Sequence, residues 1–142
     1  MIRAATPADI DPIVAMCAEF IAEGTYLGMI AFERARFERL IAALVASNAA
    51  DVLVTDRLNG MIAMVMERSD LTGDVMAGEL FWWVRPGARG VTGWRLQQAG
   101  ERWARERGAT IMRMAAPDEN VGRMLERNGF KRAEIMYQKG LT

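Results

Sequence analysis

The sequence contains no histidine and a single cysteine, Cys17. Without histidine, neither a Ser-His-Asp triad nor a Cys-His pair can form, and every histidine-ligated metal site is excluded, so no metal is expected. One cysteine permits no internal disulfide, which favours a reducing cytoplasm. Because Cys17 lies in the apolar helical pattern "IVAMCAEF", it is expected to be buried rather than to act as a nucleophile.

The chain also lacks long apolar runs and a net charge. No apolar stretch approaches the roughly 20 residues that span a bilayer, so no membrane partner is expected. Its 142 residues, 51% apolar and 25% charged, suit a single globular domain covering residues 1–142. Residues 85–132 carry eleven basic against five acidic residues. This excess is too small and interrupted for a nucleic acid, whereas a small phosphorylated ligand fits it.

Hydrophobic periodicity predicts the order strand, two helices, three strands, helix, strand, helix, strand. Thr6 and Pro7 open the first helix, Gly24 ends it, and Asn59-Gly60 signals a hairpin. The predicted strands are 2–5, 51–55, 61–67, 76–84, 110–116 and 133–139, and the predicted helices are 7–23, 31–47, 91–107 and 119–127. This order indicates an α/β fold with a mixed, mostly antiparallel sheet (α+β) and helices on both faces.

The loop "VRPGARGVTG", residues 84–93, holds three glycines and two arginines and leads into a long helix. Glycine lets the backbone approach a ligand closely, and the free N–H groups at a helix start bind anions. A strand-to-helix turn with no ligand has a similar composition. The loop alone therefore leaves a turn and an anion cradle equally open.

Three stretches resemble the GNAT superfamily of acetyl-CoA-dependent N-acetyltransferases: "ELFWWVRPGARGVTGWRL", "DENVGRMLERNGF" and "IRAATPADIDPIVAM". Val84 and Pro86 stand in the usual places, and Arg89 opens the Arg/Gln-x-x-Gly-x-Gly/Ala signature. The element order agrees over essentially the whole chain, which implies a GNAT-like fold. There are two departures. Thr92 and Trp94 replace usual glycines, and Leu125 stands where many members carry a tyrosine that protonates the leaving thiolate.

The resemblance implies that acetyl-CoA is the co-substrate. Its pyrophosphate would lie on Arg89 and the backbone of the following residues, its pantetheine near Asn120 and its phosphates near Arg123. Trp82 and Trp83 point to opposite faces of the sheet, so one should be in the core and the other, Trp82 among the implied binding residues, could line the acetyl pocket. Core packing and a solvated helix face are the alternatives for Trp82 and Arg123. The implied acetyl-CoA-binding residues are Trp82, Val84, Arg89, Gly90, Val91, Thr92, Gly93, Trp94, Asn120 and Arg123.

The family reaction is direct attack of an amine on the thioester. Deprotonating an alkyl ammonium at pH 7 costs roughly 4–5 kcal/mol, so a carboxylate acting through water is needed. Glu79 is the candidate base, with a solvent-facing carboxylate as the equal alternative and Glu67 as a weaker candidate. By resemblance, the Val84 N–H would bind the oxyanion. Tyr137 on the final strand is the fallback acid.

The acceptor is an amine of a small molecule or a protein. It would lie near the first two helices and the loop at 69–74, where Tyr26, Glu23, Asp70 and Asp74 could favour a cation. The alternative function is a catalytically inactive GNAT-fold binding or structural module, which Leu125 and the irregular glycines favour. A homodimer is compatible with the fold.

Overall fold

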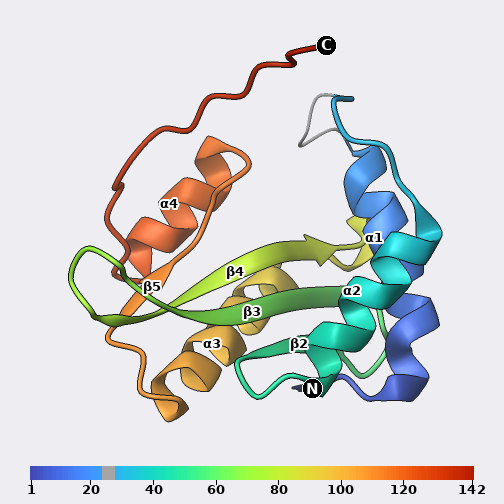
Figure 1. Cartoon of the computed structure of the whole chain (residues 1–142), viewed down its shortest axis with the longest axis horizontal. Helices are drawn as coiled ribbons and strands as arrows, with labels where there is room; N and C mark the ends of the chain where they lie inside the picture. Colours follow the sequence, from blue (N-terminus) through green and yellow to red (C-terminus); the bar gives the residue numbers. More distant parts are fainter. Residues whose placement is uncertain (24–27) are drawn as a thin grey trace.

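The computed structural model describes residues 1–23 and 28–142, so Gly24 and Tyr26 lie outside the described residues. Figure 1 shows the course of the chain. The elements are β1 (Ile2–Ala4), the 3-10 helix η1 (Pro7–Asp9), α1 (Ile10–Ala22), α2 (Arg34–Ala46), β2 (Ala50–Thr55), β3 (Gly60–Arg68), β4 (Val75–Val84), the 3-10 helix η2 (Pro86–Ala88), α3 (Val91–Glu106), β5 (Ile111–Arg113) and α4 (Glu119–Arg127).

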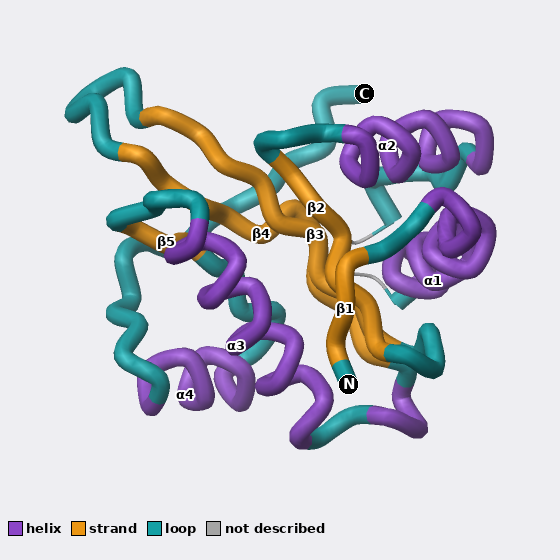
Figure 2. The backbone as a smooth tube through the Cα atoms, turned by 90° about the horizontal axis from the view of Figure 1, so that it is seen from below, coloured by secondary structure: helices purple, strands orange, loops and turns teal. Residues whose placement is uncertain are grey.

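Among these residues, five strands form one sheet in the order β1-β2-β3-β4-β5. Neighbours are antiparallel except for the parallel pair β4–β5. Figure 2 shows the sheet between α1 and α2 on one face and α3 and α4 on the other. Each face carries its own apolar core, one including Ile13 and Trp83 and the other Ile62 and Leu96. The α/β fold with a mixed sheet and helices on both faces is confirmed.

The start of α1 is tied to β1 by one buried carboxylate. Asp9 accepts hydrogen bonds from the Thr6 N–H at 2.8 Å and from the Arg3 guanidinium at 2.7 and 3.0 Å. The Arg3 contact holds the pKa of Asp9 well below its usual range. Thr6 and Pro7 therefore open a helical turn as predicted, although that turn is the 3-10 helix η1 and α1 follows it.

The predicted hairpin between β2 and β3 is present, but its glycine serves a different purpose from the one expected. Leu58 takes the left-handed conformation, with φ of 52°, and the Asn59 N–H bonds the Thr55 hydroxyl at 3.0 Å. A Cβ at Gly60 would lie 3.0 Å from Leu96 Cδ1. Gly60 thus allows α3 to approach the sheet closely.

Three predicted elements differ from the structure. The second helix begins at Arg34 rather than at residue 31, and β5 has three residues rather than the seven expected. The predicted final strand at 133–139 is wrong, because residues 131–142 take neither helical nor strand form. Figure 1 shows them running past α4 without a neighbouring strand, and an isolated strand has no hydrogen-bond partner to stabilise it.

No helix in the described part of the chain is long and apolar enough to cross a membrane.

Candidate active site

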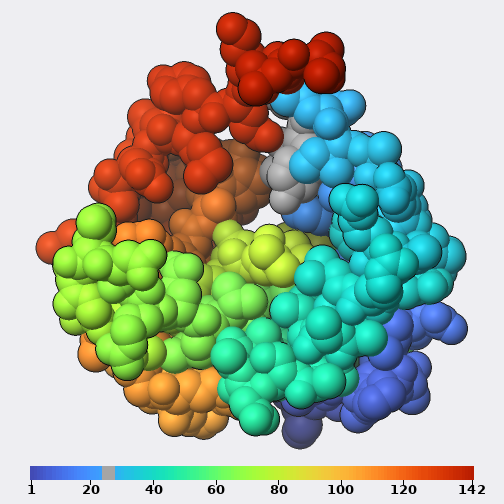
Figure 3. All heavy atoms as spheres, in the orientation of Figure 1, coloured from blue at the N-terminus to red at the C-terminus, as the bar shows by residue number. Residues whose placement is uncertain are grey.

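β4 and β5 pair only over residues 76–78 and 111–113, and then diverge. On its other edge, β4 pairs with β3. Met64 of β3 pairs with Glu79, and Ala63 pairs with Phe81. Leu80 is therefore an extra residue on β4 and forms a β-bulge. Figure 3 shows the surface hollowed beside the yellow-green atoms of β4, between the N-terminal helices and the C-terminal part.

The backbone of β4 beyond this bulge presents hydrogen-bonding groups toward the side that β5 has left. The Arg85 N–H bonds the Asn59 carbonyl at 2.9 Å, so Arg85 is a hydrogen-bonded pair position with β3. Such positions alternate along an antiparallel ladder. The N–H groups of Trp82 and Val84 therefore point away from β3, where an extended ligand could pair with them.

Glu79 lies at the point where β4 and β5 part. Its Oε1 accepts a hydrogen bond from the Ala115 N–H at 2.8 Å, which bridges the two diverging segments. Burial raises the pKa of Glu79 to about 7, and the Ala115 N–H opposes part of that rise. A carboxyl group that is half ionised near neutral pH suits proton transfer.

The loop after β4 ends in an uncapped helix start. Gly90, the N-cap of α3, has φ of 111°, and no side chain of the described residues caps this helix. The N–H groups of residues 90–93 therefore have no acceptor within the helix. A Cβ at Gly90 would meet nothing within 4 Å, so the space beside these amides is open. Together with the helix dipole, this arrangement favours an anion.

Thr92 and Gly93 face the sheet rather than this open space. Thr92 Cγ2 is 3.4 Å from the position that a Cβ of Gly60 would take, and a Cβ at Gly93 would lie 3.6 Å from Trp82 Cζ2. The threonine in place of a usual glycine is accommodated because its side chain packs over Gly60. Trp82 has a buried indole Nε1 that lacks a partner in the described residues.

Trp94 links the start of α3 to the residue after α4, because its Nε1 donates to Asn128 Oδ1 at 3.1 Å. The sequence predicted a role for Trp94 but none for Asn128, for the bulge at Leu80 or for the bridging amide of Ala115. No single-sequence signal marks these three residues. Each acquires its role from a segment distant in the sequence.

The structure directs Arg89 toward α1. Its Nη2 lies 2.7 Å from Glu23 Oε2, its Nε donates to the Val84 carbonyl at 3.0 Å, and its guanidinium carbon is 4.7 Å from the Trp83 ring centroid. Arg85 is held similarly, 3.0 Å from Glu19. Glu23, expected near the acceptor, is thus an ion-pair partner of the loop.

The remaining candidates are dispersed. Asn120 and Arg123 are exposed on α4 and hydrogen-bond to each other. Leu125 is 5% exposed in the core, and Tyr137 is 88% exposed in the C-terminal segment. In the described part of the chain, neither position brings an acid toward Glu79. Asp74 accepts a hydrogen bond from Thr72 within its own loop. The described residues also hold no cluster of metal-ligating side chains.

No protein-family model and no curated protein matches the chain. Solved structures do. An acetyltransferase from Trypanosoma brucei is 14% identical with a TM-score of 0.72, covering 99% of each chain. A ribosomal-protein-alanine N-acetyltransferase from Brucella melitensis biovar Abortus 2308 is 18% identical with a TM-score of 0.71, covering 98% of this chain and 96% of that one.

A transcriptional regulator from Bacillus halodurans C-125 is 19% identical with a TM-score of 0.80, covering 98% of this chain and 97% of that one. At these identities the likeness concerns the fold, and the names of the matched proteins differ. The sheet order, the divergence of β4 from β5 and these matches agree with the expected architecture. The chain has the fold of the GNAT superfamily of N-acetyltransferases.

Proposed function

We propose that this protein transfers the acetyl group of acetyl-CoA to an amine, by direct attack, in the hollow beside β4. One arrangement carries the proposal. The uncapped start of α3 stands at one end of the open edge of β4, and the carboxyl group of Glu79 stands at the other. The pyrophosphate, the pantetheine chain and the thioester of acetyl-CoA would thus follow one another along β4.

The length of β4 assigns the parts of acetyl-CoA. The pyrophosphate would bind the amides of residues 90–93, beside the open space at Gly90, and the pantetheine would extend along β4 toward Glu79. Val84 lies five positions after Glu79 on β4, a distance of roughly 16 Å. The Val84 N–H therefore suits pantetheine better than the oxyanion, which is the role that the family resemblance implied for it.

The Trp82 N–H is the better oxyanion donor. It points to the same open side and lies two residues nearer Glu79, roughly 10 Å along the strand. A carboxylate, a bridging water, an attacking amine and a thioester carbonyl span about that distance at ordinary hydrogen-bond and bond lengths. Glu79 and the Trp82 amide can thus act on the same reaction centre.

In this reaction Glu79 accepts the ammonium proton through water. Its raised pKa of about 7 brings it closer to that of the amine than an ordinary carboxyl group would be. The amine nitrogen then bonds to the thioester carbon and releases its second proton to water, the carbon–sulfur bond breaks, and the thiolate of CoA leaves. Since Leu125 is buried and carries no acid, the thiolate takes its proton from solvent.

One set of observations favours a second candidate, a module that binds CoA without turnover. Leu125 replaces the usual acid, Tyr137 lies in an exposed segment, and the charge of Arg89 is paired with Glu23. Such a module would still bind CoA through the free N–H groups at the start of α3, but it would not catalyse acetyl transfer. The two candidates differ in amine-dependent release of CoA.

The test is a screen of amine substrates that measures release of CoA, with calorimetry of CoA binding in parallel. Glu79→Gln should lower kcat/KM by about 10²–10⁴-fold, the range for loss of a general base, and leave CoA affinity unchanged. Glu67→Gln, on neighbouring β3, is the matched control and should keep wild-type activity. Tight CoA binding without turnover of any amine would favour the binding module. Equal activity of the two variants would remove Glu79 from the mechanism.

A further inference from the structure

Two arginines of the loop after β4 are held by two glutamates of α1. Arg85 Nε lies 3.0 Å from Glu19 Oε2, and Arg89 Nη2 lies 2.7 Å from Glu23 Oε2. Each pair joins residues that are 66 positions apart in the sequence. The two glutamates lie one turn apart at the C-terminal end of α1, where the helix dipole is negative, so the two arginines offset an unfavourable charge. We call these four residues the loop clamp.

The loop clamp holds both ends of η2. Arg85 is the N-cap of this short helix, and Arg89 is its C-cap. An isolated, half-exposed ion pair contributes little, but here each guanidinium also donates to a backbone carbonyl, at 3.2 and 3.0 Å, so its geometry is better fixed. Gly90 directly follows Arg89 and is the N-cap of α3. The position of the free amides of residues 90–93 therefore depends on where the clamp holds Arg89.

The guanidinium of Arg89 and the start of α3 lie on opposite faces of the sheet. The guanidinium carbon is 4.7 Å from the centroid of the Trp83 ring, and Trp83 belongs to the core beneath α1 and α2. Gly93, in the first turn of α3, is directed at Trp82, which packs against the core beneath α3. Consecutive residues of a strand point to opposite faces. The Arg89 side chain is thus directed toward α1 and not toward the pyrophosphate site.

We propose that Glu23 and Arg89 are positioning residues for CoA. Their ion pair holds the free amides at the start of α3 in place, and the Arg89 guanidinium itself does not contact the pyrophosphate. This inference rests on the proposed function, because it assumes that CoA binds at these amides. A loop that is already held in its binding conformation loses less freedom when the ligand binds, so the ion pair raises affinity through the backbone.

The two roles for Arg89 predict opposite effects of Glu23→Gln on CoA binding. If Arg89 bound the pyrophosphate, this substitution would free its guanidinium and remove a negative charge near an anion, and both changes would tighten binding. If the ion pair positions the loop, the same substitution weakens binding. Half-exposed residues in contact couple weakly, so the expected loss of affinity is about 3- to 10-fold.

Calorimetry with CoA on the full-length wild type, Glu23→Gln, Arg89→Gln and the double variant tests this inference. Each single variant should lose about 3- to 10-fold in affinity, and the double variant should lose no more than the weaker single variant, because all three lack the same contact. Pantetheine, which has no pyrophosphate, should bind all four proteins alike. In the acetyl-transfer assay, KM for acetyl-CoA should rise while kcat stays unchanged, whereas a loss of folded protein would lower kcat.

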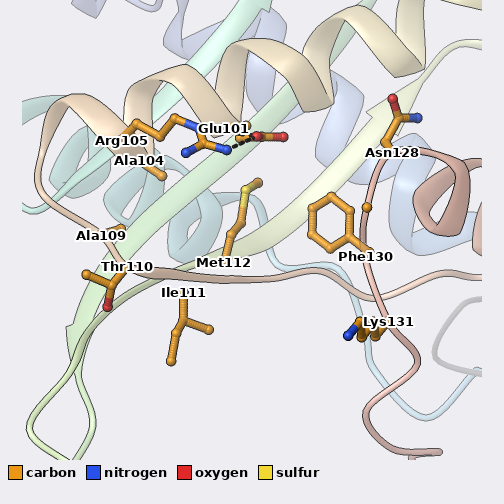
Figure 4. A pocket seen from close by; sticks show the side chains of 11 residues that line it. Glu101, Ala104, Arg105, Ala109, Thr110, Ile111, Met112, Asn128, Phe130 and Lys131 are labelled. Carbon is orange, nitrogen blue, oxygen red and sulfur yellow. Dashed lines mark hydrogen bonds and ion pairs between the residues drawn. The ribbon is translucent and has the colours of Figure 1, made fainter.

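Glu101→Gln is the matched control, since it also removes a carboxylate that pairs with an arginine. Figure 4 shows this pair beside a pocket of about 380 Å³, with Arg105 Nη2 2.7 Å from Glu101 Oε1. Both residues belong to α3, so their pair holds no loop in place, and the control should bind CoA as wild type does. Equal or tighter CoA binding by Glu23→Gln, or additive losses in the double variant, would overturn the inference and leave the proposed function standing. A wild-type chain that binds no CoA would overturn both.

Discussion

At the scale of single residues, two opposing effects act on the ionised carboxylate of Glu79. The Ala115 N–H at 2.8 Å favours the ionised carboxylate, and burial disfavours it more strongly, which leaves the pKa at about 7. A strand carboxyl in water would titrate near 4.5. The protein therefore maintains, at the point where two strands part, a group that costs stability when it is charged.

This cost predicts the pH dependence of stability. In the unfolded chain Glu79 loses its proton near pH 4.5, and in the folded chain near 7, so between these values the folded state binds more protons. Unfolding free energy should then fall as pH rises through that window, by on the order of 1–3 kcal/mol. Glu79→Gln should abolish this fall and be more stable than wild type at pH 8, although its kcat/KM should be lower.

Urea unfolding at pH 5, 6, 7 and 8 checks this expectation, with Glu67→Gln as the control that keeps the wild-type slope. Activity should change in the opposite sense and rise through pH 7 as the base ionises. Parallel stability curves for wild type and Glu79→Gln would show that Glu79 is not the buried titrating group.

At the scale of elements, the start of α3 is positioned by glycines with different tasks. Gly60 on β3 lets the helix approach the sheet, because a Cβ there would lie 3.0 Å from Leu96 Cδ1. Gly90 supplies a backbone turn with φ of 111°, which side chains rarely adopt. Gly87, in the preceding 3-10 helix, has open space around it and no such turn.

Gly90→Ala should therefore weaken CoA binding by about 10-fold or more, since strain of about 1–3 kcal/mol at this position would displace the amides of residues 90–93. Gly87→Ala is the matched control and should bind CoA as wild type does. Calorimetry with CoA and with pantetheine separates the phosphate contacts from the rest, because pantetheine lacks the pyrophosphate. An equal loss of affinity for CoA and for pantetheine would contradict binding of the pyrophosphate at the start of α3.

At the scale of the whole molecule, β4 joins the two cores of the protein. Phe81 and Trp83 belong to the core beneath α1 and α2, and Ala77 and Val84 belong to the core beneath α3. The extra residue at Leu80 shifts the alternation of side chains along the strand, so the two halves of β4 are out of phase. A ligand along this strand would touch both the start of α3 and the segment after β5.

CoA should accordingly stabilise the entire fold rather than one loop. At a concentration of 100 times its Kd, the expected gain is about 2.7 kcal/mol, or roughly 5–10 °C in Tm for a chain of this length. Thermal unfolding followed by circular dichroism gives the measurement. Gly87→Ala should show the same increase and Gly90→Ala a smaller one. An unchanged Tm at millimolar CoA would contradict the proposal that CoA binds at the start of α3.

Local sequence signals predicted much of this architecture. Thr6 and Pro7 mark the first helical turn, and α4 covers residues 119–127 as expected. Gly108 and Gly129 follow helices with φ of 82° and 91°. These features depend on neighbours within one or two turns, which a single sequence displays. The loop at 84–93 was identified as a place where a helix begins, and its open amides follow from that alone.

The tertiary structure decided what depends on segments far apart in the chain. The bulge at Leu80 arises from the register of β3 against β4, the Glu79 pKa from burial near Ala115, and the place of Thr92 from Gly60 on another strand. The strand-like pattern of residues 133–139 predicted a strand that the single chain does not form. A strand needs a neighbour for its hydrogen bonds, and periodicity in sequence carries no information about where that neighbour is.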